Sequence, residues 1–344
     1  MITPWKEVSD PAVLAIKPVV SVAMLAYNHS AFIAEAIGGV AMQKADFPIE
    51  LVIGVDCCQD NTLEIVLRYQ KLHPKLIRVL VPEQRLGMHK NFFLTLESCR
   101  GKYTAICEGD DFWIHPQKLA IQIHFLEVNP PVAGSFHDCF VLHQSSGRKE
   151  LRVGSKPIDR TPNVASIIGE NNIATCSMVF RNVIPICEIE EWLGRTRKSD
   201  FMLALLVAQR GPWHYIDDPM SVYRVHDGGI WSGAHEVERY GHNIQFWEML
   251  DNFSAYASVA DVIGAKKRND IRGLSIALAR GGKLWQSFKH YLRSLGPKHA
   301  LHGRYFRSSK YFKEFARCLI ARSRMLKLAD SIRRKVSGPN MKTL

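Results

Sequence analysis

Short apolar segments alternate with segments of helical periodicity over the first 140 residues. The apolar segments are VVSVAMLAY, IELVIGVD, LIRVLVP and KYTAIC, and each precedes one of SAFIAEAIGGVAMQ, NTLEIVLRYQKL, KNFFLTLESC and QKLAIQIHFLEV. Four repeats of strand followed by helix predict a mainly parallel sheet with helices on both faces. We expect helices to begin at Ser30 and at Asn61, where Glu64 completes a capping-box pattern.

The pattern changes after residue 140. Residues 141–170 are polar and rich in turn residues, and we expect them to cross over the sheet. Next come TCSMVF, DFMLALLVAQRG and WHYIDDPMSVYRVH, which predict a strand, an amphipathic helix and a strand pair. Beyond about residue 240 the pattern is helical. The chain is therefore predicted to comprise an α/β domain over 1–240 and a helical extension over 241–344.

The composition fits a globular protein that is neither secreted nor membrane-integral. With 344 residues, of which 47% are hydrophobic, the chain can bury one large core and a smaller one. It has no apolar segment near the ~20 residues that span a bilayer, and its N-terminus has no signal-peptide pattern. Its eight cysteines form no CxxC pair. Reduced thiols in the cytoplasm are expected.

The positive charge is confined to the end of the chain. The net charge is +12, yet residues 261–344 contain 21 Lys and Arg against four acidic residues, so the rest of the chain is mildly acidic. A nucleic-acid enzyme normally carries basic charge around its cleft. We therefore do not expect nucleic acid as a partner.

Polar residues follow each of the four predicted strands. These strand ends read AYNHS, VDCCQDN, PEQRLG and CEGDD. Ligands of open parallel sheets bind outside the carboxyl ends of the strands, so these loops are the candidate site. None of them is a GxGxxG or a GxxxxGK[ST] motif, which disfavours a dinucleotide-binding domain and a P-loop enzyme.

The CEGDDFW segment ends a buried strand on three carboxylates. Glu108, Asp110 and Asp111 supply hard oxygen ligands, which suit Mg²⁺ or Mn²⁺ held jointly with phosphate oxygens. The alternative is an exposed turn in which Asp111 caps a helix. His226 could ligate the same cation, and the pair Gly228 and Gly229 allows backbone amides to approach a phosphate closely.

The strand ends together resemble the inverting nucleotide-diphospho-sugar glycosyltransferases of family 2, which have a GT-A fold. The resemblance covers residues 18–235 and rests on SVAMLAYNHSAFIAEAI, VDCCQDNT, RLGMHKNF, CEGDDFW and YRVHDGGIWSG, in the family's order. Ala26 replaces the family's Thr, Val55 and Cys58 interrupt its second acidic motif, and Glu108 takes the first position of its D-x-D. The implied fold is a GT-A-like, mixed, mainly parallel sheet with a donor half at 18–140 and an acceptor half at 141–240.

The resemblance assigns roles to the loop residues. Asp110 is the first candidate for metal ligand, with Glu108 and Asp111 second, and His226 lies near the metal and the diphosphate. Asp56 accepts a hydrogen bond from the imide N–H of the base, and the loop of Ala26, Tyr27 and Asn28 lies against the base or the ribose; the alternative for Tyr27 is a core aromatic residue. Arg85, Lys90, Arg224 and Trp231 are candidate neighbours of the donor, whereas Asp60, next to Asn61 and Thr62, is as well explained by helix capping.

An inverting transfer needs one general base on the acceptor side. The resemblance places it at Asp200, immediately before a predicted helix. Ser199 or Asp200 could instead cap that helix, and both roles are compatible. Asp217 and Asp218 are the alternative carboxylates.

These assignments predict transfer of a sugar from a UDP- or dTDP-sugar to a hydroxyl of a surface polysaccharide or a lipid-linked glycan precursor. A sugar-phosphate nucleotidyltransferase would also use acidic metal ligands on a similar sheet, and would release pyrophosphate. A non-enzymatic carbohydrate- or nucleic-acid-binding module would turn over no nucleotide-sugar.

The C-terminal tail has an apolar stripe with basic residues around it. Residues at steps of three and four form the stripe: Tyr311, Phe315, Cys318, Ala321, Met325, Leu328, Ile332 and Val336. Such a helix suits the anionic cytoplasmic surface of a membrane, where it would bring the active site to a lipid-linked acceptor. Alternatively the stripe packs on the catalytic domain or on a second subunit of a homodimer.

Overall fold

The computed structural model describes residues 5–185, 195–229 and 235–294, and the single positions 188, 233, 317 and 320. The chain divides into two compact units, residues 1–233 and 234–344. Trp231 lies outside the described residues. So does the tail beyond residue 310, which carries the apolar stripe and its basic residues, apart from the single helical positions Arg317 and Ile320.

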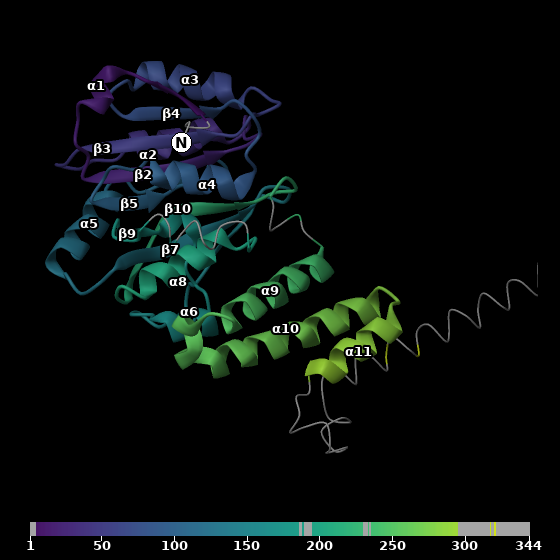
Figure 1. Cartoon of the computed structure of the whole chain (residues 1–344). Helices are drawn as coiled ribbons and strands as arrows, with labels where there is room; N and C mark the ends of the chain where they lie inside the picture. Colours follow the sequence, from purple (N-terminus) through teal and green to yellow (C-terminus); the bar gives the residue numbers. More distant parts are fainter. Residues whose placement is uncertain are drawn as a thin grey trace, which may run out of the picture. The chain divides into compact units, whose positions relative to one another are not determined.

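The first half of unit 1 confirms the predicted strand and helix repeats. Its four parallel strands lie in the order β4-β3-β2-β5, with bounds β2 Val20–Ala26, β3 Ile49–Val55, β4 Ile77–Pro82 and β5 Tyr103–Ile106. The helices that follow them are α2 Ile33–Ala41, α3 Thr62–Leu72, α4 Met88–Glu97 and α5 Lys118–Val128. Figure 1 shows these helices flanking the sheet. The short helix α1 (Pro11–Leu14) precedes this series.

The central strands are apolar along their whole length because helices cover both faces of the sheet. All seven residues of β2 are buried, as are six of the seven in β3. From α2, the side chains of Ile33, Ile37 and Val40 pack into the same core. This core holds the strand ends, and therefore the loops of the site, in fixed positions.

Strand β1 (Trp5–Ser9) was not predicted from the sequence. It pairs antiparallel with β4 at the edge of the sheet, where Trp5 lies opposite Pro82 and Ser9 opposite Arg78. Two of its five residues are exposed and none is fully buried. An edge strand of this kind lacks the continuous apolar signal of the central strands.

The second half of unit 1 extends the same sheet with antiparallel and parallel pairs. Beyond β5 the order is β9-β7-β10-β6, and β8 pairs with β7. The bounds are β6 Phe112–Trp113, β7 Gly134–His143, β8 Arg148–Leu151, β9 Val179–Arg181 and β10 Trp213–Val225, with helices α6 Val164–Gly169, η1 Thr175–Ser177 and α8 Ser199–Ala208. The sheet is thus the mixed GT-A-like sheet that was predicted.

Four details differ from the prediction. Residues 141–151 form a β7–β8 hairpin, and TCSMVF begins as the 3₁₀ helix η1 before the strand. WHYIDDPMSVYRVH is one strand, β10, whose pairing with β7 shifts register between Ile216 and Ser221; Pro219 lies in the shift and has no N–H to donate. Helix α8 is buried on all sides from Phe201 to Ala208, so it is not amphipathic.

Helices α2 and α3 begin with other polar contacts than those predicted from the sequence. Helix α2 begins at Ile33, three residues after Ser30, whose N–H binds the carboxylate of Asp60 at 2.9 Å. Helix α3 has Asn61 at its N-cap, but the Asn61 side chain makes no capping bond. Asp60 accepts the Thr62 N–H at 3.0 Å instead. The capping interpretation of Asp60 is therefore observed, and these bonds outweigh burial and lower its pKa to about 2.

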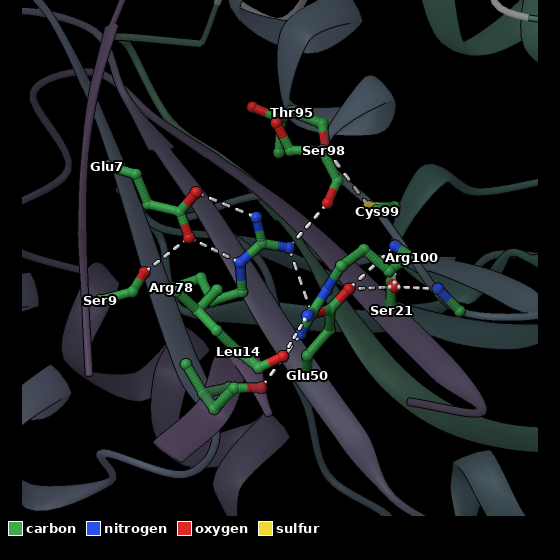
Figure 2. Close-up of polar contacts among 12 residues, drawn as sticks. Glu7, Ser9, Leu14, Ser21, Glu50, Arg78, Thr95, Ser98, Cys99 and Arg100 are labelled. Atoms are coloured by element: carbon green, nitrogen blue, oxygen red, sulfur yellow. Dashed lines mark hydrogen bonds and ion pairs between the residues drawn. The ribbon is translucent and has the colours of Figure 1, made fainter. Parts of the chain in front are cut away.

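An ion network lies at the amino-terminal ends of the parallel strands, opposite to the strand ends that carry the site (Figure 2). Glu50 on β3 is 1% exposed and accepts bonds from Ser21 on β2 at 2.6 Å, Arg78 on β4 at 3.2 Å and Arg100 at 2.6 Å. Arg78 also binds both carboxylate oxygens of Glu7 on β1, at 2.8 and 3.1 Å. The network joins the starts of β2, β3 and β4 to the antiparallel edge strand β1.

Unit 2 is helical over its described residues, as predicted. It contains α9 Glu236–Asp251, η2 Ser254–Val259, α10 Ala260–Arg280 and α11 Leu284–Ser294. Helix α10 packs against both α9 and α11 (Figure 1), and Asp270 on α10 accepts the indole N–H of Trp247 on α9 at 2.5 Å. Among the described residues of the chain, no helix has the length and apolar character needed to cross a membrane.

Candidate active site

A cavity of about 500 Å³ lies at the carboxyl ends of the parallel strands. Its wall includes Tyr27 after β2, Asp56 after β3, Arg85 after β4, and Glu108 and Asp110 after β5. The sheet therefore brings together residues from all four strand-end loops, as its topology predicts. The opposite wall comes from the second half of unit 1 and includes Asp200, Arg224 and the Gly228–Gly229 pair.

The centre of the site is the carboxylate of Asp110, with two imidazoles around it. Asp110 Oδ2 lies 3.1 Å from His226 Nε2 and 3.9 Å from His29 Nε2. The close approach depends on Gly109, because a Cβ there would lie 2.8 Å from His29 Nδ1. That Nδ1 atom is buried and has no hydrogen-bond partner among the described residues. His29 was not singled out from the sequence, although it lies in the AYNHS loop.

Burial and neighbouring charges set different protonation states in this cluster. Burial would raise the pKa of Asp110, but the hydrogen bond from His226 and the nearby His29 outweigh it and the pKa is lowered. Burial lowers the pKa of His29, and Asp110 only partly opposes this effect. Glu108 is held well above its ordinary pKa, first by burial and then by the charges of Asp110 and Asp200. These pKa directions favour an ionised Asp110 and a neutral His29. Glu108 lies beside them as a largely buried carboxyl group with two acidic neighbours.

This donor set fits a divalent cation that is shared with a ligand. Asp110 and Glu108 offer carboxylate oxygens, and His226 and His29 offer imidazole nitrogens. Among the described residues, no three His, Cys, Asp or Glu side chains form a ready metal-binding cluster. Mg²⁺ in nucleotide sites typically takes only one or two protein carboxylates and completes its shell with phosphate and water.

Asp111 does not line the cavity. It is 2% exposed, and its Oδ1 accepts the backbone N–H of Arg224 at 2.8 Å. Arg224 in turn donates to the Asp110 carbonyl at 2.8 Å and to Glu35 Oε2 at 2.6 Å. These bonds fasten the end of β10 to the loop after β5. Asp111 and Arg224 therefore hold the segments of Asp110 and His226 next to each other.

Asp56 and Tyr27 lie at another part of the cavity wall. The two carboxylate oxygens of Asp56 accept the backbone N–H groups of Leu86 at 2.6 Å and Gly87 at 2.9 Å. Gly87 has φ +78°, a conformation that favours glycine. The guanidinium of Arg85 lies over the ring of Tyr27, 4.2 Å from its centroid. Asp56 thus fixes the loop that holds the Arg85 guanidinium over the Tyr27 ring.

Two other loop residues lie away from the cavity. Asn28 has φ 55°, and its Oδ1 accepts the N–H of Gln59 at 2.8 Å. Lys90 is exposed on α4. Neither residue is part of the cavity wall, whereas Ala26 is.

Asp200 lies in the first turn of α8 and lines the cavity. Lys198 occupies the N-cap and no side chain caps the helix, so neither Ser199 nor Asp200 is its cap. Asp200 Oδ2 accepts a hydrogen bond from Thr175 Oγ1 at 3.2 Å, and Ser199 Oγ lies 2.7 Å from His89 Nδ1 on α4.

The alternative carboxylate Asp217 is outside the cavity. It is 60% exposed, and it pairs with Arg160 at 2.9 Å. Asp218 is also absent from the cavity wall. Of the carboxylates considered as the base, the cavity therefore contains Asp200.

The cavity wall contains several residues that the sequence did not single out. Besides His29, they include Asn91 and Phe92 on α4 and a group from the second half of the unit: Arg152, Asn171, Thr175, Arg197, Lys198 and Tyr223. Most of them belong to residues 141–200, which contain no motif. Their place in the cavity wall follows from the positions of the β7–β8 hairpin and of the segment that leads to α8. These positions are known only from the folded chain.

The comparisons with known sequences agree with this geometry. Residues 21–185 match the family model described as Glycosyl transferase family 2. An uncharacterized protein of Mycobacterium tuberculosis is 32% identical over 228 residues, which are 66% of this chain and 63% of that protein. The putative teichuronic acid biosynthesis glycosyltransferase TuaG of Bacillus subtilis is 32% identical over 110 residues, which are 32% of this chain and 42% of TuaG. The chain thus spans less than two thirds of the length of these relatives.

Two solved structures share the fold. S. aureus TarS 1–349, in complex with UDP-GlcNAc, has a TM-score of 0.56 at 16% identity and covers 80% of this chain and 90% of its own. The mannosyltransferase PcManGT of Pyrobaculum calidifontis, in complex with GDP-Man and Mn²⁺, has a TM-score of 0.54 at 18% identity. The match covers 93% of this chain and 90% of the PcManGT chain. The matched sequence and the shared fold lead to one conclusion: residues 21–185 match glycosyltransferase family 2, and the chain has a GT-A-like fold.

Proposed function

We propose that this protein is an inverting glycosyltransferase that moves a sugar from a UDP- or dTDP-sugar to a hydroxyl of a surface polysaccharide or a lipid-linked glycan precursor. The observation that carries the proposal is the composition of one cavity. Its wall includes Asp110, His29, Asp56, the Tyr27–Arg85 pair and Asp200, and His226, which is not itself a wall residue, contacts Asp110 at 3.1 Å. Such a set can bind a nucleotide, bind its diphosphate through a cation, and remove a proton.

The nucleotide would bind between the loops after β2 and β3. A pyrimidine base can stack on the face of Tyr27 that Arg85 leaves free, and its imide N–H can donate to Asp56. Asp56 already accepts two backbone N–H groups, from Leu86 and Gly87. A carboxylate has about four lone-pair sites, so it can accept one further hydrogen bond.

The cation is proposed to be Mg²⁺ or Mn²⁺, with Asp110 and His226 as its protein ligands and Glu108 beside them. When bound, it would neutralise charge on the departing diphosphate. The pKa of Glu108, raised by burial and by the charges of Asp110 and Asp200, supports this arrangement, because a carboxyl group in that setting would gain from a nearby cation. Gly228 and Gly229 line the same cavity, where a backbone without side chains lets a phosphate come close; the N–H of Gly229 already donates to the His226 carbonyl at 3.1 Å.

Asp200 is proposed as the general base. In one displacement, the acceptor hydroxyl gives its proton to Asp200 while its oxygen bonds to the anomeric carbon. The bond from that carbon to the diphosphate oxygen breaks, and the nucleoside diphosphate leaves. The hydrogen bond from Thr175 fixes the orientation of the Asp200 carboxylate before the acceptor arrives.

The acceptor and the location of the enzyme are proposed on other grounds. TuaG is described by its role in teichuronic acid biosynthesis, which supports a polysaccharide acceptor. We place the enzyme on the cytoplasmic face of the membrane, with the basic tail as its anchor and a homodimer contact as the alternative use of the tail. In α11, Trp285 is 78% exposed and precedes the exposed cations Lys289 and Arg293, a combination found at membrane interfaces.

The proposal is tested with a panel of nucleotide-sugars, incubated with the full chain in the presence and absence of Mn²⁺. Release of UDP or dTDP that depends on the metal supports a glycosyltransferase. Formation of pyrophosphate from a nucleoside triphosphate and a sugar phosphate would indicate the nucleotidyltransferase. Binding of a glycan without turnover of any donor would indicate the binding module.

A further inference from the structure

Three cationic residues line the cavity on the side of Asp200. Arg197 and Lys198 directly precede α8, three and two residues before Asp200. Arg152 follows β8, and its Nε donates to the carbonyl of Asn172 at 3.3 Å. Asn172 is three residues before Thr175, whose hydroxyl binds Asp200. Two separate segments therefore bring positive charge to the proposed base.

Two of these three cationic groups are guanidiniums, those of Arg152 and Arg197, and they form no ion pair among the described residues of the unit. Within residues 5–185 and 195–229, Arg197 also makes no side-chain hydrogen bond. Other arginines of the same unit are neutralised: Arg78 and Arg100 by Glu50, and Arg224 by Glu35. An arginine facing a cavity without a counter-ion is suited to an anionic ligand, because its planar fork binds phosphate or carboxylate in a bidentate manner.

The position of these arginines relative to the donor residues indicates which substrate they meet. The proposed donor contacts are Tyr27 and Asp56 for the nucleoside, and Asp110 with His226 for the diphosphate. Arg152 and Arg197 belong instead to the segments that carry Asp200, where the acceptor hydroxyl has to be deprotonated. We propose that the acceptor carries an anionic group, a phosphate or a carboxylate, close to the hydroxyl that receives the sugar, and that Arg152 and Arg197 bind it.

This inference rests on the proposed function and adds the chemical class of the acceptor. A bound anion would fix the acceptor with its hydroxyl toward Asp200, and neutral acceptors would lack this contact. The interaction between the anion and the two arginines would weaken with salt, because Arg197 is exposed to solvent and Arg152 is half-buried. The alternative is that both arginines contact the departing diphosphate, in which case they would affect the donor and not the acceptor.

The experiment uses the full chain and two steps. First, binding of UDP and of dTDP is measured by calorimetry in the presence of Mn²⁺. The tighter nucleotide is then added to saturation, and three probes are titrated into the complex: glucose 1-phosphate, methyl glucuronide and methyl glucoside. These probes offer a phosphate, a carboxylate and no charge. The variants are Arg152→Ala, Arg197→Ala and, as a matched control from β8, Arg148→Ala, whose side chain is 62% exposed and outside the cavity.

We expect at least one anionic probe to bind the complex roughly tenfold or more tightly than methyl glucoside. The preferred probe identifies phosphate or carboxylate as the group. Arg152→Ala and Arg197→Ala should abolish the preference and leave nucleotide affinity within about twofold, and Arg148→Ala should change neither. Thermal melting shows whether each variant is folded, and a variant that is not folded is replaced by the glutamine substitution at the same position, such as Arg152→Gln or Arg197→Gln.

Three results would overturn the inference. Equal binding of the charged and neutral probes means that the site has no anion preference. Loss of nucleotide affinity in Arg152→Ala and Arg197→Ala assigns the arginines to the diphosphate. If wild-type protein binds neither nucleotide, the proposed function fails, and the inference that rests on it falls too.

Discussion

His226 Nε2 lies 3.1 Å from Asp110 Oδ2, although 116 residues separate the two in the chain. The pairing of β6 with β10 accounts for the contact, since Phe112 lies opposite Val222 and Trp113 opposite Ser221. The bonds from Asp111 and Arg224 fasten the same two segments. A short antiparallel pair thus completes a cluster of two imidazoles and a carboxylate at the end of a parallel sheet.

Asp110→Asn should abolish metal-dependent binding of the nucleoside diphosphate. The amide keeps the shape of the side chain but lacks the charge that a divalent cation requires. Because Asp110 is at a strand end and outside the apolar core, the melting temperature should change little. Calorimetry of UDP binding with and without Mn²⁺ checks this. The exposed Asp217→Asn is the control, and wild-type metal dependence in Asp110→Asn would show that the cation binds elsewhere.

Asp200→Asn should lower the rate of sugar transfer by roughly 10²–10⁴, the range for a lost general base. Affinity for the donor should stay close to that of wild type, because Asp200 is on the acceptor side. Single-turnover transfer and donor binding measured in parallel separate the two effects. Normal transfer with a lower melting temperature would make Asp200 a structural residue and direct the search to Asp217 and Asp218.

The strand-end loops were predictable because the signal for them is local. A buried parallel strand is a continuous apolar run, and its polar end is visible in the sequence, as at Asp56 and Asp110. The family resemblance then associated these loops with one site. The structure brings most of the predicted site residues to one cavity, whereas Asn28, Lys90, Asp111 and His226 do not line it.

Other features depended on contacts between distant segments. The edge strand β1 is held by pairing with β4, and the register shift in β10 is visible only against β7. His29 becomes part of the site because Gly109 allows its ring to approach. Arg152 and Arg197 come from segments without a motif, so only folding shows that they border Asp200.

Glu50→Gln should lower the free energy of unfolding by about 3–5 kcal/mol, because it leaves the buried Arg78 without one of its two carboxylates. The matched control is Glu127→Gln, which removes a surface pair with Lys102 and should cost less than about 1 kcal/mol. Chemical denaturation at pH 7 compares the two variants. Equal losses would show that the network in Figure 2 contributes no more than a surface pair.

The same network makes stability depend on acid pH. Burial raises the pKa of Glu50, but bonds from Arg100, Ser21 and Arg78 outweigh it, so the folded pKa lies below the ordinary 4.5; the folded pKa of Glu7 is lowered likewise. Their contribution is therefore complete above pH 4.5 and is lost as the pH falls through the lower folded values. Between pH 7 and pH 3, wild type should lose more stability than Glu50→Gln. Parallel pH profiles would contradict this.

The tail should bind anionic membranes through its basic residues. Each such residue near the surface contributes about 1 kcal/mol at modest salt. Flotation with anionic and neutral liposomes over a salt series compares the full chain with a chain that ends at residue 300. We expect salt-sensitive flotation of the full chain on anionic liposomes only. Flotation that is equal for the two chains, or absent for both, would favour packing of the tail within the protein or in a homodimer.

The central claim is that one cavity binds a nucleotide-sugar through a cation and activates it. Its most direct test is the rate at which wild-type protein releases nucleoside diphosphate from a panel of UDP-, dTDP- and GDP-sugars, measured with Mn²⁺ and with a chelator. We expect release from a UDP- or dTDP-sugar that requires Mn²⁺ and is lost in Asp110→Asn. Release that is unaffected by the chelator and by Asp110→Asn, or turnover of none of the donors, would contradict it.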